Sequence, residues 1–300
     1  MRFHSIPGRT RYAVLRGLRA PALRVLLLIT AALWSGGCAS SPEVLDDAPQ
    51  VLRIKGSDTM LHLVIRWAEE FMKQHPDIAV YAEGGGSATG IRALIDGDVH
   101  LSSASRSLRP DEVRQLLEKQ GSLGLSILTA RDALSVYLHP SNPVTNLGRA
   151  QLKDIFAGRT MNWKQVGGTD LPITVIGRQP NSGTFLFFEE HVLDGEPYSD
   201  AAETVPTTAA VIRRVQAQAG AIGYGGLAYG RDVTLSRVEG VEPTAENVRN
   251  GSYPIARYLY FFASEPPRGK TKLFIDWVLS DAGQRIVQEI GYIPLWELRE

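Results

Sequence analysis

Short apolar strands in this chain run repeatedly into turns rich in glycine and hydroxyl side chains, and a pattern of helical period follows each turn. Three such units start from strands expected at residues 51–54, 78–81 and 173–176 and continue into helices expected over 61–72, 91–95 and 185–191. Alternation of strands and helices is typical of a parallel sheet covered by helices. The pattern therefore predicts an α/β fold with mixed, mostly parallel sheets flanked by helices.

The remaining elements are less regular. Strands are expected near residues 99–101, 132–138 and 253–262, and helices are expected from Pro110, over 151–156 and, as one last helix, over 272–290. We expect two lobes, with the chain crossing from the first to the second and returning. The first lobe would comprise residues 50–138 plus 247–300, and the second would comprise residues 139–246.

Charge is unevenly distributed along the 300 residues, although the formal net charge is zero. The first 37 residues carry six arginines and no acidic residue, so the rest of the chain has 26 basic and 32 acidic residues. A body with a net charge of −6 argues against binding to nucleic acid.

The N-terminus has the pattern of a targeting signal. An apolar run at residues 25–34 follows the arginines, is too short to span a bilayer, and precedes small residues and Cys38, the only cysteine. This resembles a bacterial lipoprotein signal, although Ser35 stands where an aliphatic residue is usual. We predict a lipoprotein signal peptide over 1–37, lipidation at Cys38, a tether over 38–50, and a protein anchored to a membrane in the periplasm or cell envelope. The alternative is an ordinary signal peptide cut near Gly37.

Four polar turns lie where predicted strands end: residues 56–59, 84–90, 103–106 and 177–184. In open parallel sheets, ligands bind at the edge where the strands end. Helix N-termini offer free N–H groups and partial positive charge, glycine permits close approach, and hydroxyl groups add donors. Arg106 and Arg178 can give paired hydrogen bonds to an oxyanion. The turns therefore indicate a site for one small oxyanion, and the alternative is a set of ordinary helix caps.

The cap residues leave room for a ligand in this interpretation. Ser87 is followed three residues later by glycine, and Ser182 is followed at the same spacing by phenylalanine, so neither begins a capping box. We therefore expect the N–H groups of these first helical turns to remain open. Asp58 is an acid in the first turn of its helix, where it would either cap the helix or accept a hydrogen bond from a protonated anion.

Catalytic and metal chemistry have little support. The six histidines show no pair at metal-binding spacing, and the turn at residues 85–89 lacks the last glycine of a nucleophile elbow. We expect no metal, no cofactor and no enzymatic activity, with a phosphate-ester hydrolase as a remote alternative.

Longer motifs make a resemblance specific. GSDTM at 56–60, EGGGSATGI at 83–91, SASRSL at 103–108, the stretch 142–168, GRQPNSGT at 177–184 and GAIGYGG at 220–226 resemble PstS-like phosphate-binding proteins. These are type II periplasmic binding proteins of phosphate ABC transporters. The resemblance covers residues 50–300 and implies two lobes, with phosphate held in the inter-lobe cleft and delivered to an inner-membrane permease. The ligands that it implies are Ser57, Thr59, Ser87, Ser105, Arg106, Arg178, Ser182, Gly183 and Thr184.

One position departs from the family pattern. Well-known members carry an aspartate where this chain has Arg106, and that aspartate accepts the proton of hydrogen phosphate. Asp58 is the expected substitute acceptor. The residues alone leave sulfate, arsenate and molybdate open as ligands, and a phosphate-binding lipoprotein without a transport role (a sensor, scavenger or adhesin) is the alternative function. We expect a monomer.

Overall fold

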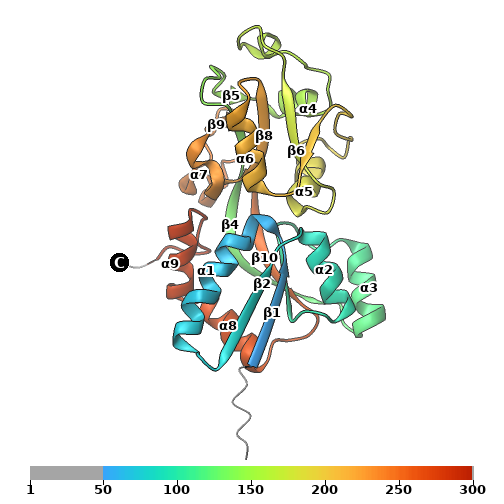
Figure 1. Ribbon diagram of the computed structural model, residues 1–300, viewed down its shortest axis with the longest axis vertical. Coiled ribbons are helices and arrows are strands. Elements are labelled where there is room, and N and C mark those ends of the chain that lie inside the picture. Colours follow the sequence, from blue (N-terminus) through green and yellow to red (C-terminus); the bar gives the residue numbers. More distant parts are fainter. Residues whose placement is uncertain (1–49, 299–300) are drawn as a thin grey trace, which may run out of the picture. The chain divides into compact units, whose positions relative to one another are not determined.

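The computed structural model describes residues 50–298, so the expected signal peptide, Cys38 and the tether up to residue 49 lie outside the described residues. Strands and helices alternate from the start of this part (Figure 1). The first elements are β1 (Gln50–Gly56), α1 (Asp58–Gln74), β2 (Ile78–Glu83), α2 (Ser87–Asp96), β3 (Leu101–Ala104) and α3 (Pro110–Gln120).

The middle of the chain holds shorter elements. They are β4 (Leu125–Leu138), β5 (Asn146–Leu147), α4 (Arg149–Phe156), the 3-10 helix η1 (Trp163–Val166), β6 (Thr174–Arg178), α5 (Gly183–His191), β7 (Glu203–Val205) and α6 (Thr208–Ala217), then β8 (Ala221–Gly226), the 3-10 helix η2 (Leu227–Asp232), β9 (Thr234–Val238) and α7 (Ala245–Arg249). The chain finishes with β10 (Ala256–Ala263), α8 (Gly269–Val278) and α9 (Asp281–Ile290).

The strands of the described residues join in the order β2-β1-β3-β10-β4-β8-β6-β7, with β9 pairing β4 and β5 off this path. The pairs β1–β2, β1–β3, β6–β7, β6–β8 and β5–β9 are parallel. The pairs of β10 and β4 are antiparallel. The predicted α/β class with mixed, mostly parallel pairing is confirmed.

One long strand links the two lobes of this fold. The first part of β4, from Leu125 to Ala133, pairs with β10, and the last part, from Leu134 to Leu138, pairs with β8. The change of partner falls in the middle of a continuous strand. The residues before this point are therefore held in register with β10, and the residues after it are held in register with β8.

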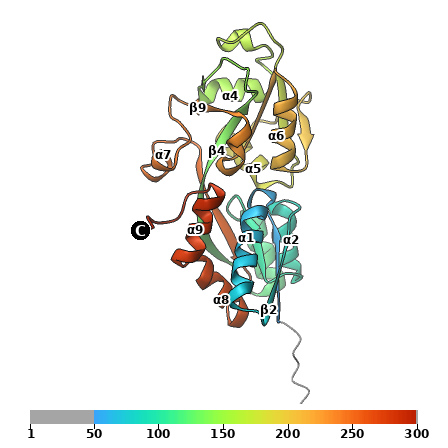
Figure 2. The ribbon, with the colours of Figure 1, turned by 60° about the vertical axis from the view of Figure 1, so that its left-hand side comes forward.

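Helices cover the sheet of the first lobe on both faces (Figures 1 and 2). α1 presents the apolar face that its period predicts, and its buried residues include Trp67 and Phe71, which pack with Phe261 of β10 and Phe274 of α8. α2 and α3 pack on the other face, where their apolar side chains form a second buried core with Phe262 of β10. Burial of such aromatic side chains dominates core energetics.

The second lobe has its own core. A cluster of buried side chains from α4, α5, β4, β6 and β8 includes Phe156, Phe188 and Tyr224, whose rings lie 4.2–5.5 Å apart. α6 packs on the opposite side with Val211 and Val215 against Tyr137 of β4. Each lobe therefore has a core of its own.

The last helix is a correction to the sequence-based expectation. Instead of one helix over 272–290, α8 ends at Val278 and α9 begins at Asp281. Ser280 caps α9 by accepting a hydrogen bond from Gly283 N. Gly283 lies so close to Val278 that a Cβ would stand 2.4 Å from the Val278 carbonyl oxygen, and its own carbonyl accepts from Trp67 Nε1. The break brings α9 back against α1.

Candidate functional site

Four helices begin where strands of the two lobes end: α1 follows β1, α2 follows β2, α5 follows β6 and α6 follows β7. The side chain of the N-cap Ser57 makes no cap hydrogen bond to α1, and the N-cap of α2 is Gly86, which has no side chain to do so. In α6, Thr207 Oγ1 accepts from Ala210 N at 3.1 Å. These N-termini provide partial positive charge and N–H donors for an anion.

One expectation about these caps is wrong for α5. Ser182 Oγ accepts hydrogen bonds from Thr184 N at 3.2 Å and from Phe185 N at 3.4 Å, so two first-turn donors are satisfied by the cap itself. Serine is a good N-cap without the second half of a capping box, because its own oxygen reaches the N2 and N3 amides. Ser182 can still donate its hydroxyl hydrogen, and its predicted role as a ligand stays a prediction.

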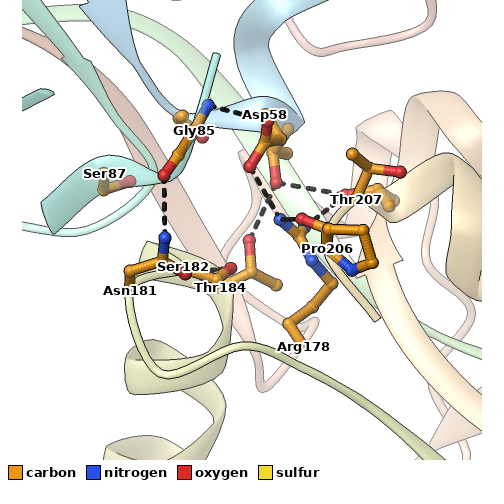
Figure 3. A network of polar contacts seen from close by, with 12 residues as sticks. Asp58, Gly85, Ser87, Arg178, Asn181, Ser182, Thr184, Pro206 and Thr207 are labelled. Carbon is orange, nitrogen blue, oxygen red and sulfur yellow. Dashed lines mark hydrogen bonds and ion pairs between the residues drawn. The ribbon is translucent and has the colours of Figure 1, made fainter. Parts of the chain in front are cut away.

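Five buried hydroxyl groups lie close together near these helix ends, and Figure 3 labels two of them, Ser87 and Thr184. We call them the hydroxyl cluster: Thr59, Ser87, Ser105, Thr184 and Thr208. Thr59 Oγ1 lies 2.9 Å from Thr184 Oγ1 and 3.4 Å from Thr208 Oγ1. Ser105 Oγ lies 3.3 Å from Thr184 Oγ1 and 3.4 Å from Ser87 Oγ. Because the cluster draws on α1, α2 and the end of β3 as well as α5 and α6, both lobes supply donors to one place.

Arg178 lies beside the cluster at the end of β6, with 1% of its surface exposed. Its Nη1 donates to Thr208 Oγ1 at 2.8 Å, and its Nη2 donates to Asp58 Oδ2 at 3.0 Å and to the Pro206 carbonyl at 2.8 Å (Figure 3). Its Nε is buried and has no hydrogen-bond partner within residues 50–298. Burial lowers the pKa of the guanidinium, and the Asp58 carboxylate opposes that shift.

A second arginine completes the site from the strands that link the lobes. Arg257 of β10 stands opposite Asp132 of β4, and its Nη2 and Nε donate to Asp132 Oδ2 at 2.8 and 3.0 Å. Its Nη1 donates to Thr184 Oγ1 at 3.1 Å and to the Ser105 carbonyl at 3.2 Å. Burial raises the pKa of Asp132, and the guanidinium of Arg257 opposes this.

The charges around the cluster balance. Two buried or nearly buried ion pairs, Asp58–Arg178 and Asp132–Arg257, supply two cations and two anions. Removing one member of such a pair is costly, because the other charge is left buried without a partner. An anion in this place would therefore be held by hydroxyl groups, backbone amides and guanidinium hydrogens, and not by an excess of positive charge.

Gly183 marks the point where α5 meets the first lobe. A Cβ at this position would lie 2.3 Å from Ser87 Oγ and 2.9 Å from Ser105 Oγ. The neighbouring Asn181 makes two contacts to the same lobe: its Nδ2 donates to the Gly85 carbonyl at 2.9 Å, and its carbonyl accepts from Ala88 N at 3.1 Å (Figure 3). Glycine is thus required here by close approach.

Two tyrosines hold the first turn of α1 in place. Tyr229 donates to the Asp58 carbonyl at 3.2 Å, and Tyr292 donates to the Thr59 carbonyl at 2.6 Å. Burial raises the pKa of Tyr229 to about 12, so its hydroxyl keeps its hydrogen at neutral pH. Both hydrogen bonds are accepted by backbone carbonyls, so they hold in place the backbone that carries the Thr59 hydroxyl.

The structure brings most of the predicted ligand residues together at the hydroxyl cluster, but not all of them. Thr59, Ser87, Ser105 and Thr184 lie in the cluster, Gly183 touches it, and Asp58 and Arg178 border it as an ion pair. Ser57 is buried at the start of α1, where its amide donates to Ser103. Arg106 is not brought into the cluster: its Nη1 and Nη2 donate to Glu112 of α3 at 2.8 and 2.6 Å. Its predicted role as a ligand stays untested, with its paired donors already engaged.

Sequence reasoning missed Thr208, Asp132 and Arg257. Thr207 and Thr208 form a fifth hydroxyl-rich turn, but the strand before it has only three residues and no clear pattern. The signal for Arg257 was a lone charge within an apolar strand, since a buried charge requires a partner.

Among the residues that the structure describes, no group of three or more His, Cys, Asp or Glu side chains could hold a metal ion. Within that same part of the chain, no helix is long and apolar enough to cross a membrane.

Comparisons with known proteins agree with this arrangement. A profile of the PBP superfamily domain matches residues 44–282. The phosphate-binding protein PstS of Bacillus subtilis is 33% identical over 83% of this chain and 82% of its own length. PstS of Pseudomonas aeruginosa is 29% identical over 91% of this chain and 94% of its own length.

Solved structures give the same picture. A Clostridium perfringens substrate-binding protein with bound phosphate superimposes with a TM-score of 0.77 at 32% identity, covering 82% of this chain and all of that one. An ABC-type phosphate transport receptor from Vibrio cholerae gives a TM-score of 0.68 at 29% identity, covering 81% of this chain and 99% of that one. The chain therefore belongs to the PBP superfamily, as a PstS-like member with the two-lobed fold.

Proposed function

We propose that this protein captures inorganic phosphate between its two lobes and delivers it to an ABC transporter. The observation that carries the proposal is the hydroxyl cluster, in which both lobes place buried donors beside Arg178 at the ends of four helices. The names of the relatives, PstS and phosphate transport receptor, support phosphate as the ligand. The anion would be bound through Thr59, Ser87, Ser105, Thr184 and Arg178, with Gly183 allowing close contact.

Binding would be coupled to closure of the lobes. Because each lobe holds only part of the donor set, the anion makes its full set of bonds only when the lobes meet, and it therefore favours the closed state. The lobes that we propose follow the sequence-based division at residues 50–138 plus 247–300 and 139–246. The chain passes between these lobes through β4 and through the segment that enters β10.

Asp58 is the proposed source of selectivity for phosphate. Its side chain is 11% exposed, and each oxygen accepts one hydrogen bond: Oδ1 from Gly85 N at 3.0 Å and Oδ2 from Arg178 Nη2 at 3.0 Å. Each carboxylate oxygen has a second lone pair, so Asp58 can also accept a hydrogen bond from a protonated ligand. Sulfate carries no proton at neutral pH and would face a carboxylate without a hydrogen bond.

The cellular arrangement also remains a proposal. We propose that Cys38 is lipidated after removal of residues 1–37 and that residues 38–50 tether a monomer to the membrane on the periplasmic side, facing an inner-membrane permease. PstS relatives support an exported binding protein, and the anchor rests on the sequence pattern alone.

Isothermal titration calorimetry tests the ligand. The protein is stripped of bound anions by unfolding and refolding and is then titrated with phosphate and, separately, with sulfate at the same pH. We expect tight binding of phosphate and at least about 100-fold weaker binding of sulfate, which corresponds to about 2.7 kcal/mol. Equal affinity for both anions would indicate a general tetrahedral-oxyanion site, and no heat with either anion would overturn the proposal.

A further inference from the structure

The direction of the hydrogen bonds around Arg257 fixes the polarity of Thr184. A guanidinium has donors and no acceptor, so the 3.1 Å contact between Arg257 Nη1 and Thr184 Oγ1 has the threonine oxygen as acceptor. The hydroxyl hydrogen of Thr184 must then point away from the arginine. Two oxygens within its reach are those of Thr59 and Ser105, which lie 2.9 and 3.3 Å from Thr184 Oγ1.

The same arrangement recurs at Thr208. Arg178 Nη1 donates to Thr208 Oγ1 at 2.8 Å, and Asp58 holds that arginine as Asp132 holds Arg257. Two series of hydrogen bonds, each running from a carboxylate through a guanidinium to a threonine hydroxyl, therefore end in the hydroxyl cluster. Thr59 Oγ1 lies between their ends, within 3.4 Å of both threonine oxygens.

We propose that the Asp132–Arg257 pair is a positioning pair that turns the Thr184 hydroxyl into a donor for the bound anion, and that Thr208 is a further anion donor oriented in the same way by Asp58–Arg178. This inference rests on the proposed function and deepens it. A free hydroxyl rotor would have to lose its rotational freedom when the anion binds. A hydroxyl already oriented by an arginine has lost that freedom on folding, so preorganised donors bind an anion more tightly.

The place of Arg257 in the fold adds a dependence on closure. Asp132 and Arg257 are cross-strand neighbours in the register of β4 and β10, and Asp132 Oδ1 also accepts from Leu227 N at 2.9 Å. Thr184 belongs to α5 of the second lobe, while the Ser105 carbonyl that shares Arg257 Nη1 belongs to the first. The Thr184 hydroxyl is therefore oriented as a donor only when α5 reaches the linking strands.

A double-mutant cycle separates this role from a merely structural one. Arg257→Lys keeps a positive charge for Asp132 and removes the fork that reaches Thr184, and Thr184→Val removes the hydroxyl at constant shape. Thr208→Val is the matched control partner, because Arg178 and not Arg257 orients that hydroxyl. Phosphate dissociation constants are measured by calorimetry for the wild type, the three single variants and the two double variants. Thermal unfolding without ligand shows that each variant is folded.

We expect Arg257→Lys to weaken phosphate binding about 10- to 100-fold in the wild type and in Thr208→Val. In Thr184→Val it should weaken binding by less than about threefold, because the hydroxyl that it orients is already gone. Thr208→Val alone should weaken binding about tenfold or more. The same fold-loss for Arg257→Lys in the wild type and in Thr184→Val would overturn the role of Arg257, and unchanged affinity of Thr208→Val would remove Thr208 as a donor. Failure of the wild type to bind phosphate would instead refute the proposed function.

Discussion

Replacing Gly183 by alanine is expected to block anion binding without unfolding the protein. The added methyl carbon would lie 2.3 Å from Ser87 Oγ and 2.8 Å from Ser87 Cβ, whereas ordinary contacts begin near 3.4 Å. Ser87 cannot turn away at low cost, because its Oγ accepts from Ser105 N at 3.1 Å. The start of α5 must then move away from α2 by about 1 Å, since overpacking of a close contact shifts the backbone.

The magnitude follows from the hydrogen bonds that such a shift breaks. A bond of ordinary length, when stretched by about 1 Å, lies beyond hydrogen-bonding distance. Losing two bonds to a charged ligand, each worth about 1.5–3 kcal/mol, costs about 3–6 kcal/mol. The phosphate dissociation constant should then rise by a factor of about 100 to 20,000.

Calorimetric titration of phosphate into Gly183→Ala measures this loss, with Gly177→Ala as the control. Gly177 lies in the same segment at the end of β6, and a Cβ there would lie 3.8 Å from the Glu203 carbonyl oxygen, which is an ordinary contact distance. We expect the control to bind phosphate like the wild type and both variants to unfold cooperatively. Binding by Gly183→Ala at wild-type affinity would refute the inference that the lobes meet at this glycine around the anion.

Three further predictions concern selectivity, salt and pH. Asp58→Asn should reduce the preference for phosphate over sulfate by about tenfold or more, because it removes the acidic acceptor; an unchanged affinity ratio in competition titrations would exclude Asp58 from this role. Raising sodium chloride from about 0.05 to 0.5 M should change the phosphate dissociation constant by less than about threefold, since the site charges are paired and buried; a tenfold change would contradict the charge balance. His100 accepts a hydrogen bond from Arg53 N through Nδ1, and burial, together with the charges of Lys270 and Arg53, lowers its pKa. The unfolded chain therefore binds a proton at this histidine more readily than the folded protein does. The stabilisation that comes from the neutral His100 side chain is present above the ordinary histidine pKa of about 6.5 and is lost as pH falls toward the lower folded-state pKa. The unfolding temperature should fall more between pH 7 and pH 5 in the wild type than in His100→Gln, and equal falls would contradict the assignment.

Much of the fold could be predicted from local patterns. The helical period of residues 61–72 and the proline after His75 predicted α1 closely, because one face of the helix is buried and the rest is exposed. β7 was missed because three residues carry no readable period. The break between α8 and α9 was missed because the apolar period continues through it, while the capping serine and the close packing of Gly283 interrupt the helix.

The candidate site could be predicted only where it follows the chain locally. The edge of the sheet brings together hydroxyl groups from turns that the sequence shows directly, such as Ser87 and Thr184. The pairing of Asp132 with Arg257 could not be read in the same way, because the two residues are 125 positions apart and meet only through the register of β4 and β10. Arg106 was predicted from its turn, but a partner six residues later, Glu112, engages it.

The most direct measurement is the position of a bound anion in a crystal. Arsenate has the shape and protonation chemistry of phosphate, and arsenic scatters X-rays anomalously, so crystals grown with arsenate locate the anion without ambiguity. We expect one strong anomalous peak about 4 Å from the hydroxyl oxygens of Thr59 and Thr184 and from the nitrogens of the Arg178 guanidinium, because the oxygens of the arsenate lie between the arsenic atom and these hydrogen-bond donors. A peak elsewhere on the protein, with none at the hydroxyl cluster, would contradict the central claim that this cluster is the anion site.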